Sequence, residues 1–289
     1  MTGYVIYNEK AGNGNTYKDI ELMVKTMYVL HGAEYKIIEI SKITNYKVFF
    51  TGLSDDDFII LCGGDGTINH FVNDTKNIHI TQKIYYYPTG TGNDFAQDLG
   101  GENSENPILI TQYLKDLPTV SVKGKTHHFL NAVGYGIDGY CCEVGDALKK
   151  ESKEKVNYTS IAIKGLLFHY KPTIAKVTVD GKEYHYNKVW IAPTMHGRFY
   201  GGGMMAAPAQ KRNNEQKELS LTLIHGAGRL RTMMVFPTIF KGKHIEHPNM
   251  VTIHTGQEIT VEFDRPVALQ IDGETVLDVS SYTAKAAGR

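Results

Sequence analysis

The sequence has few cysteines, no net charge and no long apolar run, and each shortage excludes a class of protein. The three cysteines, Cys62, Cys141 and Cys142, are odd in number and include an adjacent pair, which favours a reducing, cytoplasmic environment over a disulfide framework. The 31 basic and 31 acidic residues cancel, which argues against a dedicated nucleic-acid-binding protein. No stretch suits a transmembrane helix, and Met1–Tyr7 lacks the basic start of a signal peptide.

The rest of the chain is organised around the apolar run Phe58–Cys62, which leads directly into Gly63-Gly64-Asp65-Gly66-Thr67. Ile68, Phe71 and Val72 follow with helical spacing, so the pattern predicts a strand, a tight glycine turn and a helix N-terminus. Such a turn directs backbone amides and the positive end of a helix dipole at one point, and its glycines let a bulky anion approach. The sequence therefore predicts a phosphate-binding loop.

The carboxylate in this loop sets a condition on its ligand. Asp65 would repel a bare phosphate, so we expect a metal ion or an amide partner beside it. The alternative is a plain strand-to-helix turn capped by Asp65 and Thr67, although three glycines in four positions are more than a turn needs. The loop matches neither the GxxxxGK[ST] nor the GxGxxG nucleotide motif.

The first part of the chain alternates strand and helix patterns, which predicts a parallel sheet with helices on both faces. The expected strands are Tyr4–Tyr7, Tyr35–Ile40, Phe58–Cys62 and Ile84–Tyr87, with a helix over Thr16–Leu30. Ligands of such sheets bind at the carboxyl ends of the strands. The loops expected there are Asn8–Gly12, Ser41, Gly63–Thr67 and Gly90–Asp94.

From about Pro118 the sequence changes to short alternating runs separated by turns such as Asp180-Gly181 and Asp272-Gly273. This alternating pattern predicts an antiparallel β-rich domain, interrupted by one helix over roughly residues 138–167. We therefore expect an α/β domain over residues 1–120 and a β-rich domain over residues 121–276. Residues 277–289 form a segment that could return to the first domain.

Several motifs together resemble one family. Gly63–Thr67 resembles the nucleotide loop shared by diacylglycerol kinases, sphingosine kinases, NAD kinases and phosphofructokinases. Pro88–Ala96 resembles the P-x-GTxNDFA signature of the diacylglycerol kinase catalytic family of lipid kinases, and Ile271–Glu274 resembles its DGE segment. Residues 242–244 and 247–248 resemble a further segment, so the likeness covers nearly the whole chain. It implies that residues 1–120 form a nucleotide-binding domain like that of NAD kinase and phosphofructokinase. It also implies that residues 121–276 form an antiparallel β-sandwich domain that binds the lipid substrate.

The resemblance implies an ATP site and its residues. These are Asn8, Glu9, Lys10, Ala11, Gly12, Ser41, Gly63, Gly64, Asp65, Gly66, Thr67, Thr91, Asn93 and Asp94. Glu9 stands where the family usually has proline. Asn93 and Asp94 could also be no more than a helix cap, a position that both residue types favour.

The resemblance also implies catalytic and metal-binding carboxylates. Asp272 and Glu274 are the expected catalytic pair, with Glu274 slightly favoured as the base, although Asp-Gly is also a common hairpin turn. Asp65, Asp94 and Glu218 are candidate Mg²⁺ ligands. A structural Mg²⁺ of the family would lie near an Asp-Gly turn that this chain replaces with the polar loop Lys211–Glu218, where Glu215 or Glu218 could substitute.

Two further stretches have both a functional and a plain interpretation. Arg198–Pro208, rich in glycine and methionine, is either a wall of the lipid cleft or a buried turn and strand. Arg229, Arg231, Lys241 and Lys243 either face anionic lipid headgroups or form an ordinary solvated surface.

The leading hypothesis is an ATP- and Mg²⁺-dependent lipid kinase that acts on diacylglycerol, or on a sphingoid base or another lipid alcohol, at the membrane surface. An NAD kinase is the second enzyme hypothesis. A catalytically silent regulator that binds nucleotide or lipid is the hypothesis from another class. No nucleic-acid partner is expected, and assembly into a homodimer stays open.

Overall fold

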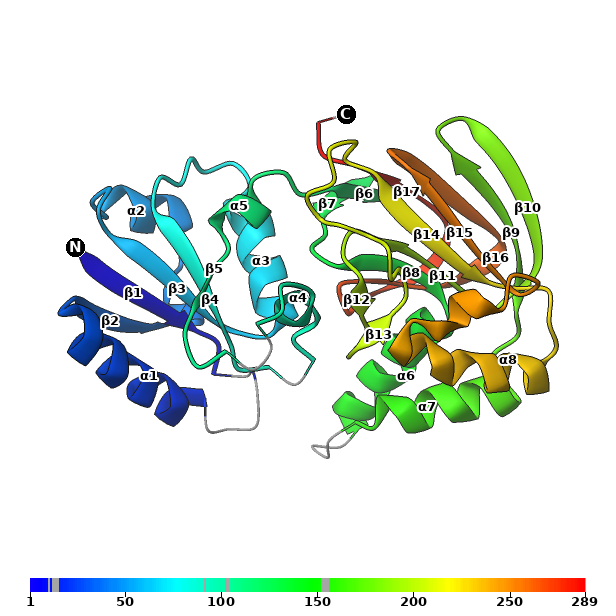
Figure 1. Cartoon of the computed structure of the whole chain (residues 1–289), viewed down its shortest axis with the longest axis horizontal. Helices are drawn as coiled ribbons and strands as arrows, with labels where there is room; N and C mark the ends of the chain where they lie inside the picture. Colours follow the sequence, from blue (N-terminus) through cyan, green and yellow to red (C-terminus); the bar gives the residue numbers. More distant parts are fainter. Residues whose placement is uncertain (10, 12–15, 91, 102–103, 152–155, 289) are drawn as a thin grey trace. The chain divides into compact units, whose positions relative to one another are not determined.

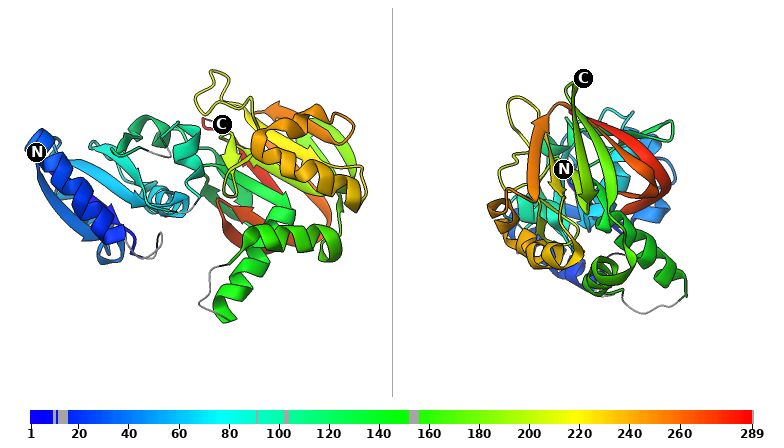
Figure 2. Two further views of the ribbon diagram at one scale, coloured as in Figure 1. Left: turned by 60° about the horizontal axis from the view of Figure 1, so that its bottom comes forward. Right: turned by 90° about the vertical axis from the view of Figure 1, so that its right-hand side faces the viewer.

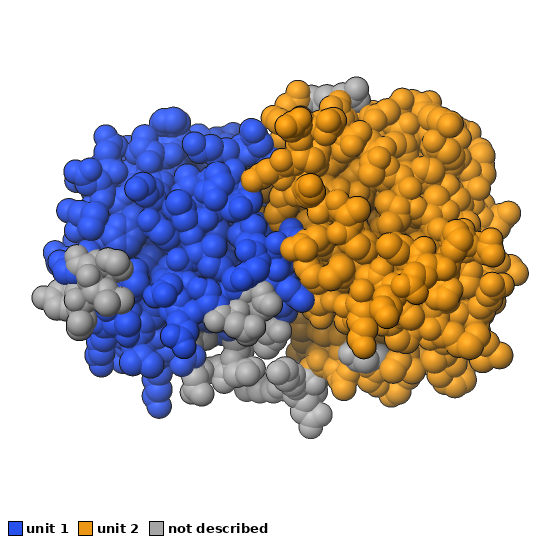
Figure 3. Space-filling view, in the orientation of Figure 1, with its two compact units in different colours: residues 1–116 blue, residues 117–289 orange. Residues whose placement is uncertain are grey.

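The computed structural model describes residues 1–9, 11, 16–90, 92–101, 104–151 and 156–288. The chain divides into two compact units, Met1–Asp116 and Leu117–Arg289 (Figure 3). Lys10, Gly12 and Thr91, three of the expected ATP-site residues, lie outside the described residues.

The first unit alternates strands and helices, as its sequence pattern predicts (Figure 1). In chain order it consists of β1 (Thr2–Tyr7), α1 (Thr16–His31), β2 (Glu34–Glu39), η1 (Ile40–Lys42), α2 (Tyr46–Thr51), β3 (Phe58–Gly63), α3 (Asp65–Thr75), β4 (Lys83–Pro88), α4 (Asp94–Asp98), β5 (Ile108–Leu109) and α5 (Thr111–Leu114). The sheet order is β2-β1-β3-β4-β5, and only β5 runs antiparallel to its neighbour. The expected parallel sheet is confirmed.

Apolar periodicity accounts for the packing of this unit. The helical spacing of Ile20 and Met23 on α1 buries both side chains against Val5 and Ile60 of the central strands. Residues 59–63 of β3 are all buried, as expected for a central parallel strand covered on both faces. The loop that follows β3 is therefore attached to the best-packed strand of the sheet.

The second unit is built mainly from antiparallel strands (Figures 1 and 2). Its elements are β6 (Thr119–Val122), β7 (Lys125–His128), β8 (Ala132–Gly136), α6 (Ile137–Glu151), α7 (Tyr158–Lys164), η2 (Gly165–His169), β9 (Thr173–Val179), β10 (Lys182–Val189), β11 (Ile191–Met195), β12 (Phe199–Tyr200), β13 (Met204–Met205), β14 (Leu219–Ile224), α8 (Arg229–Val235), η3 (Phe236–Lys241), η4 (Lys243–Glu246), β15 (Val251–Gly256), β16 (Glu258–Ile271) and β17 (Glu274–Lys285).

Strand β16 connects the two parts of the large sheet. Its first half pairs with β9 and its second half with β8, while register shifts interrupt its pairing with β17. One apolar core lies within the strands, where the rings of Tyr135 and Phe263 stack at 4.1 Å between centroids. A second core joins strands to helices around Trp190.

Three expectations about the second unit need correction. The single helix expected over residues 138–167 is two α-helices, α6 and α7, followed by the π-helical turn η2. The two runs Glu258–Phe263 and Val267–Ile271 form one bulged strand, β16. Residues 277–285 stay in the second unit, because β17 pairs there with β16 and β6.

Candidate active site

In the first unit, the carboxyl ends of the parallel strands meet at one edge of the sheet. Tyr7 pairs with Cys62, Cys62 pairs with Tyr87, and Gly63 pairs with Pro88, so β1, β3 and β4 end nearly in step. The loops after them begin at Asn8, Gly64 and Thr89. The predicted ATP-binding loops therefore start from the same edge, as the strand order requires.

Two of these loops are in direct contact. The backbone amides of Thr89 and Gly90 donate to the Gly63 carbonyl oxygen at 2.9 and 3.2 Å. A Cβ atom on Gly90 would lie 2.6 Å from the Gly64 Cα, and one on Gly63 would lie 2.2 Å from Thr67 Oγ1. Gly63 and Gly90 are therefore required by packing.

Gly66 is different from these glycines. It lies in the first turn of α3 with a helical backbone, and a Cβ atom there would meet no atom of the described residues within 4 Å. Neither backbone conformation nor protein packing requires glycine at this position, and glycine weakens a helix. The space above Gly66 remains available for a ligand.

Asp65 joins the loop after β3 to the helix after β4. Its two carboxylate oxygens accept hydrogen bonds from the backbone amides of Asp94, at 2.8 Å, and Phe95, at 3.0 Å. The carboxylate thus caps the N-terminus of α4, where a negative charge is favourable. The expected amide partner is found, while a metal ligand role for Asp65 or Asp94 stays a prediction.

Asn93 holds the second loop in shape. It adopts a left-handed conformation with φ 47°, and its side-chain amide donates to the Gly90 carbonyl at 2.9 Å instead of capping α4. The Tyr86 hydroxyl donates to the Gly63 carbonyl at 3.1 Å and lies 3.3 Å from Asn93 Oδ1. Burial raises the pKa of Tyr86, which keeps this hydroxyl a donor.

The first loop and Ser41 are placed less tightly. The Asn8 side chain donates to Thr67 Oγ1 at 3.4 Å, and the Ala11 amide donates to the Asn8 carbonyl at 3.0 Å. Glu9 is exposed. Ser41 is also exposed, and its hydroxyl and backbone amide both donate to the Glu39 carboxylate.

In the second unit, Asp272 and Gly273 form the turn between β16 and β17. Their φ angles are 47° and 91°, and Ile271 pairs with Glu274, as in the Asp-Gly hairpin considered as an alternative. Asp272 does more than turn the chain. Its carboxylate accepts the backbone amides of Leu130, of Asn131 at 2.7 Å and of Ala132 at 3.0 Å.

Carboxylates converge on the side of α6 that faces this hairpin. Burial, followed by the charges of Asp138 and Asp146 and, more weakly, of Glu274, raises the pKa of the Cys142 thiol to about 12. The Thr275 hydroxyl donates to Asp146 at 2.6 Å. Glu274, the first residue of β17, is therefore an exposed carboxylate beside α6.

Asp138 is a notable group that the sequence reasoning missed. It is 7% exposed. Burial raises its pKa to about 6, opposed first by the backbone amides of Gly139 and Asp138 and then by the side chains of Gln270 and Tyr200. A Cβ atom on Gly134 would lie 1.7 Å from Asp138 Oδ2, so the carboxylate packs against the backbone of β8.

The loop expected to hold a structural metal does not fit one. The Asn214 side chain donates to the carbonyls of Lys211 and Glu218 and accepts the Glu218 amide, so it fills the centre of the loop. Glu215 is exposed. No cluster of three or more metal-binding side chains occurs among the described residues. The loop is closed by its own amide groups.

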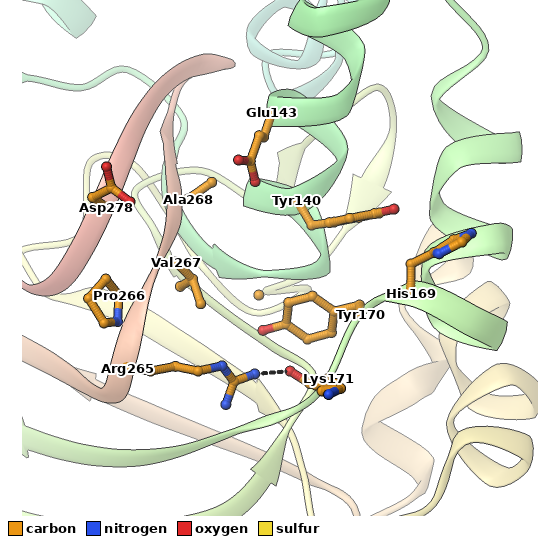
Figure 4. Close-up of a pocket in the computed structure, with 11 residues that line it drawn as sticks. Tyr140, Glu143, His169, Tyr170, Lys171, Arg265, Pro266, Val267, Ala268 and Asp278 are labelled. Carbon is orange, nitrogen blue, oxygen red and sulfur yellow. Dashed lines mark hydrogen bonds between the residues drawn. The ribbon is translucent and has the colours of Figure 1, made fainter.

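The second unit contains two regions that are apolar or enclose a cavity. Arg198–Pro208 forms the small hairpin β12–β13, and Tyr200 and Met204 are buried in the core around Trp190, in agreement with the plain interpretation of this stretch. A cavity of about 300 Å³ lies elsewhere in the second unit (Figure 4). Its lining includes Glu143, Lys171 and Arg265, charged groups that do not suit an acyl chain.

Two family models match this sequence, one mainly in the first unit and one in the second. The diacylglycerol kinase catalytic domain matches residues 2–123, which places the chain among the kinases. The YegS C-terminal NAD kinase beta sandwich-like domain matches residues 131–285. The chain therefore belongs to the diacylglycerol kinase-like family of two-domain lipid kinases, as its motifs implied.

Individual relatives are distant. The "Putative lipid kinase YtlR" of Bacillus subtilis (strain 168) is 25% identical over 84% of this chain and 79% of its own length. A diacylglycerol kinase of Mycobacterium tuberculosis is 25% identical over 75% of this chain and 70% of its own. A crystal structure of a diacylglycerol kinase from Bacillus anthracis str. Sterne has a TM-score of 0.70 at 23% identity, covering 99% and 94% of the two chains. This last likeness confirms the fold.

Proposed function

We propose that the protein is an ATP- and Mg²⁺-dependent lipid kinase that phosphorylates a lipid hydroxyl, with diacylglycerol as the first acceptor and phosphatidic acid as the product. The observation that carries the proposal is the pair of joined glycine loops at the edge of the first sheet, where Asp65 binds the start of α4 and Gly63 binds Thr89 and Gly90. The open position at Gly66 and the N-terminus of α3 suit a phosphate chain.

Mg²⁺ would enter as part of Mg–ATP. Phosphoryl transfer requires a metal to neutralise charge on the phosphates, and hard cations prefer carboxylate oxygen. Asp65 and Asp94 are the carboxylates at this edge of the sheet. Both Asp65 oxygens already accept backbone amides, which favours contact with the metal through water.

Glu274 is the better candidate for the general base. The Asp272 carboxylate is committed to three backbone amides, whereas Glu274 starts a strand and is exposed. In the proposed reaction the lipid hydroxyl oxygen attacks the γ-phosphorus while its proton passes to Glu274. The bond between the γ-phosphorus and the β,γ-bridging oxygen breaks, and ADP leaves with that oxygen.

Access to a lipid substrate requires contact with a membrane, although no helix within the described ranges is long and apolar enough to cross one. The helices of the second unit lie on the same side of it (Figures 1 and 2). Six of their large apolar side chains are exposed, and we call them the apolar face: Ile163, Phe168, Leu230, Met234, Phe240 and Ile245. Arg229 of α8 donates to the Leu166 carbonyl at 2.8 Å, which places α8 beside η2.

The charge around the apolar face is one-sided. Residues 156–172 and 226–245 contain no Asp or Glu in a chain that is neutral as a whole, and Glu246, directly after Ile245, is the first carboxylate to follow. They contain the cations Lys164, Lys171, Arg229, Arg231, Lys241 and Lys243. Exposed apolar side chains ringed by cations suit the surface of an anionic bilayer. We propose transient docking through this face.

The two other hypotheses are separated by one acceptor panel. The protein is incubated with labelled Mg–ATP and, separately, with diacylglycerol, sphingosine, undecaprenol and NAD⁺. We expect label on a lipid, diacylglycerol first. Label on NAD⁺ alone would identify an NAD kinase, and ATP binding without transfer to any acceptor would identify a regulator.

A further inference from the structure

The segment Leu130–Ala132, directly before β8, is the support on which the Asp272 turn rests. Besides accepting the three amides of this segment, Asp272 donates its own amide to the Ala132 carbonyl at 3.0 Å. Leu130 and Asn131 are 0% and 3% exposed. The position of the turn, and of Glu274 two residues later, therefore depends on where this buried segment is held.

Arg212 holds the same segment from the other side. Its Nη1 donates to the Leu130 carbonyl oxygen, and its Nη2 donates to Asn131 Oδ1. His196 assists, since its Nδ1 donates to the Leu130 carbonyl at 3.0 Å and its amide donates to the Asn131 carbonyl at 2.9 Å. The guanidinium uses the two-pronged geometry that only arginine offers.

One peptide group lies between opposite charges. The Leu130 carbonyl accepts from the Arg212 cation, while the amide hydrogen of the same peptide group, on Asn131, is donated to the Asp272 anion. Each hydrogen bond polarises the peptide group in the direction that strengthens the other. Arg212 and Asp272 thus support one another through a buried peptide group.

The loop that carries Arg212 is itself fixed. Asn214 closes the loop, and Gln210, which is 7% exposed, donates to the Glu218 carbonyl at 2.9 Å and accepts from Ser220 at 2.6 Å. The cation therefore projects from an anchored support. This loop is the one that does not fit the structural metal implied by the motifs.

We propose that Arg212 is a positioning residue for phosphoryl transfer. Its guanidinium clamps the Leu130–Ala132 segment and thereby fixes the Asp272 turn that presents Glu274. A side-chain cation thus lies at the loop where the family resemblance implies a structural metal. The inference rests on the proposed role of Glu274 as base.

The test compares Arg212→Met, which keeps much of the side-chain length without the charge, with Arg212→Lys. Lys211→Met, at an exposed neighbour, is the matched control. For Arg212→Met we expect kcat to fall by about tenfold or more, with the KM for ATP changed less than about twofold, because orientation is lost but nucleotide binding is not. Arg212→Lys should recover only part of kcat, since it cannot make both hydrogen bonds.

Hydrogen exchange gives a readout independent of activity. In Arg212→Met the amide hydrogens of Leu130, Asn131 and Ala132 should exchange with solvent about tenfold faster or more than in the wild type. In Lys211→Met their exchange rates should equal those of the wild type. Two results would overturn the proposal. One is an Arg212→Met variant in which these amides exchange at the wild-type rate, and the other is an Arg212→Met variant in which they exchange faster but kcat is unchanged. If Arg212→Met does not fold, Asn131→Ala, which removes only the Nη2 acceptor, must show the same two effects in weaker form. A wild-type protein without kinase activity would refute the proposed function, while the exchange result would still decide whether the clamp exists.

Discussion

The glycines of the loops after β3 and β4 show that one residue type serves two purposes. Gly63 and Gly90 are required because a Cβ atom on either would collide with the neighbouring loop or with Thr67. Gly66 has a helical backbone and open space, so the protein itself gains nothing from glycine there. The remaining reason is the approach of a ligand, which we take to be the phosphates of ATP.

Gly66→Ala should therefore separate stability from binding. We expect the free energy of unfolding to rise by up to about 1 kcal/mol, because alanine favours the helix. The affinity for ATP should fall by about tenfold or more, because the methyl group occupies the space of a phosphate. Denaturant unfolding and calorimetric titration measure the two quantities. Gly63→Ala is the contrast and should lose stability, while undiminished ATP affinity in Gly66→Ala would contradict this interpretation.

Asp138 makes stability depend on pH. Its pKa is raised from 3.8 to about 6 by burial, so the folded protein holds the proton more tightly than the unfolded chain. Above pH 6 the buried charge destabilises the fold, by an amount bounded at about 3 kcal/mol. This cost disappears as the pH falls through 6 toward 3.8.

Asp138→Asn should remove that dependence. We expect the variant to be more stable than the wild type at pH 7.5 and the difference to shrink steadily as the pH is lowered to 5. Urea unfolding at several pH values measures the difference. A difference that stays constant, or that grows as the pH falls, would show that this carboxyl does not titrate as its burial requires.

At the scale of elements, the helices of the second unit combine two surfaces. Their inner sides pack on the core around Trp190, while Phe168 of η2 and Leu230 and Met234 of α8 are 70%, 77% and 70% exposed. Such large exposed side chains are costly in water unless another surface covers them. The surrounding cations favour an anionic membrane as that surface.

Phe168→Ser combined with Met234→Ser should weaken binding to vesicles that contain anionic phospholipid by about tenfold or more, because two inserting side chains are lost. Ile253→Ser, at an exposed position on β15, is the control and should have no effect. Vesicle sedimentation measures binding, and binding of both proteins should fall as salt rises. Equal binding of the double variant and the wild type would exclude this face.

At the scale of the whole molecule, local patterns predicted most of the fold. Apolar periodicity and glycine turns located β1 to β4 and α1 almost to the residue, and β-strand alternation indicated an antiparallel second unit. The break between α6 and α7 was missed although the polar run of residues 149–155 interrupts the apolar spacing there, because such a run also suits the solvated face of one long helix. The continuity of β16 was missed because Asp264-Arg265-Pro266, where its pairing with β17 shifts register, resembles a turn between two strands.

The candidate site was predictable where it is contiguous in sequence and not where it depends on distant pairs. Gly63–Thr67 and Asp272–Glu274 could be found as motifs. Three features of the site depend on tertiary contacts between residues far apart in the sequence. Asp65 caps α4, Asp272 accepts backbone amides some 140 residues earlier, and Arg212 binds the segment that contains those amides. Hence the sequence suggested Asp272 and Glu274 as a pair, whereas in the structure Asp272 accepts three backbone amides and Glu274 is exposed.

The central claim is transfer of phosphate from ATP to a lipid hydroxyl with Glu274 as the base. The most direct measurement uses wild type and Glu274→Gln with labelled Mg–ATP and vesicles containing diacylglycerol, together with ATP binding by both proteins. We predict label in the lipid extract for the wild type, a loss of about 10²-fold or more in Glu274→Gln, and equal ATP binding. Equal transfer by both proteins, or ATP binding with no labelled lipid from the wild type, would contradict the account.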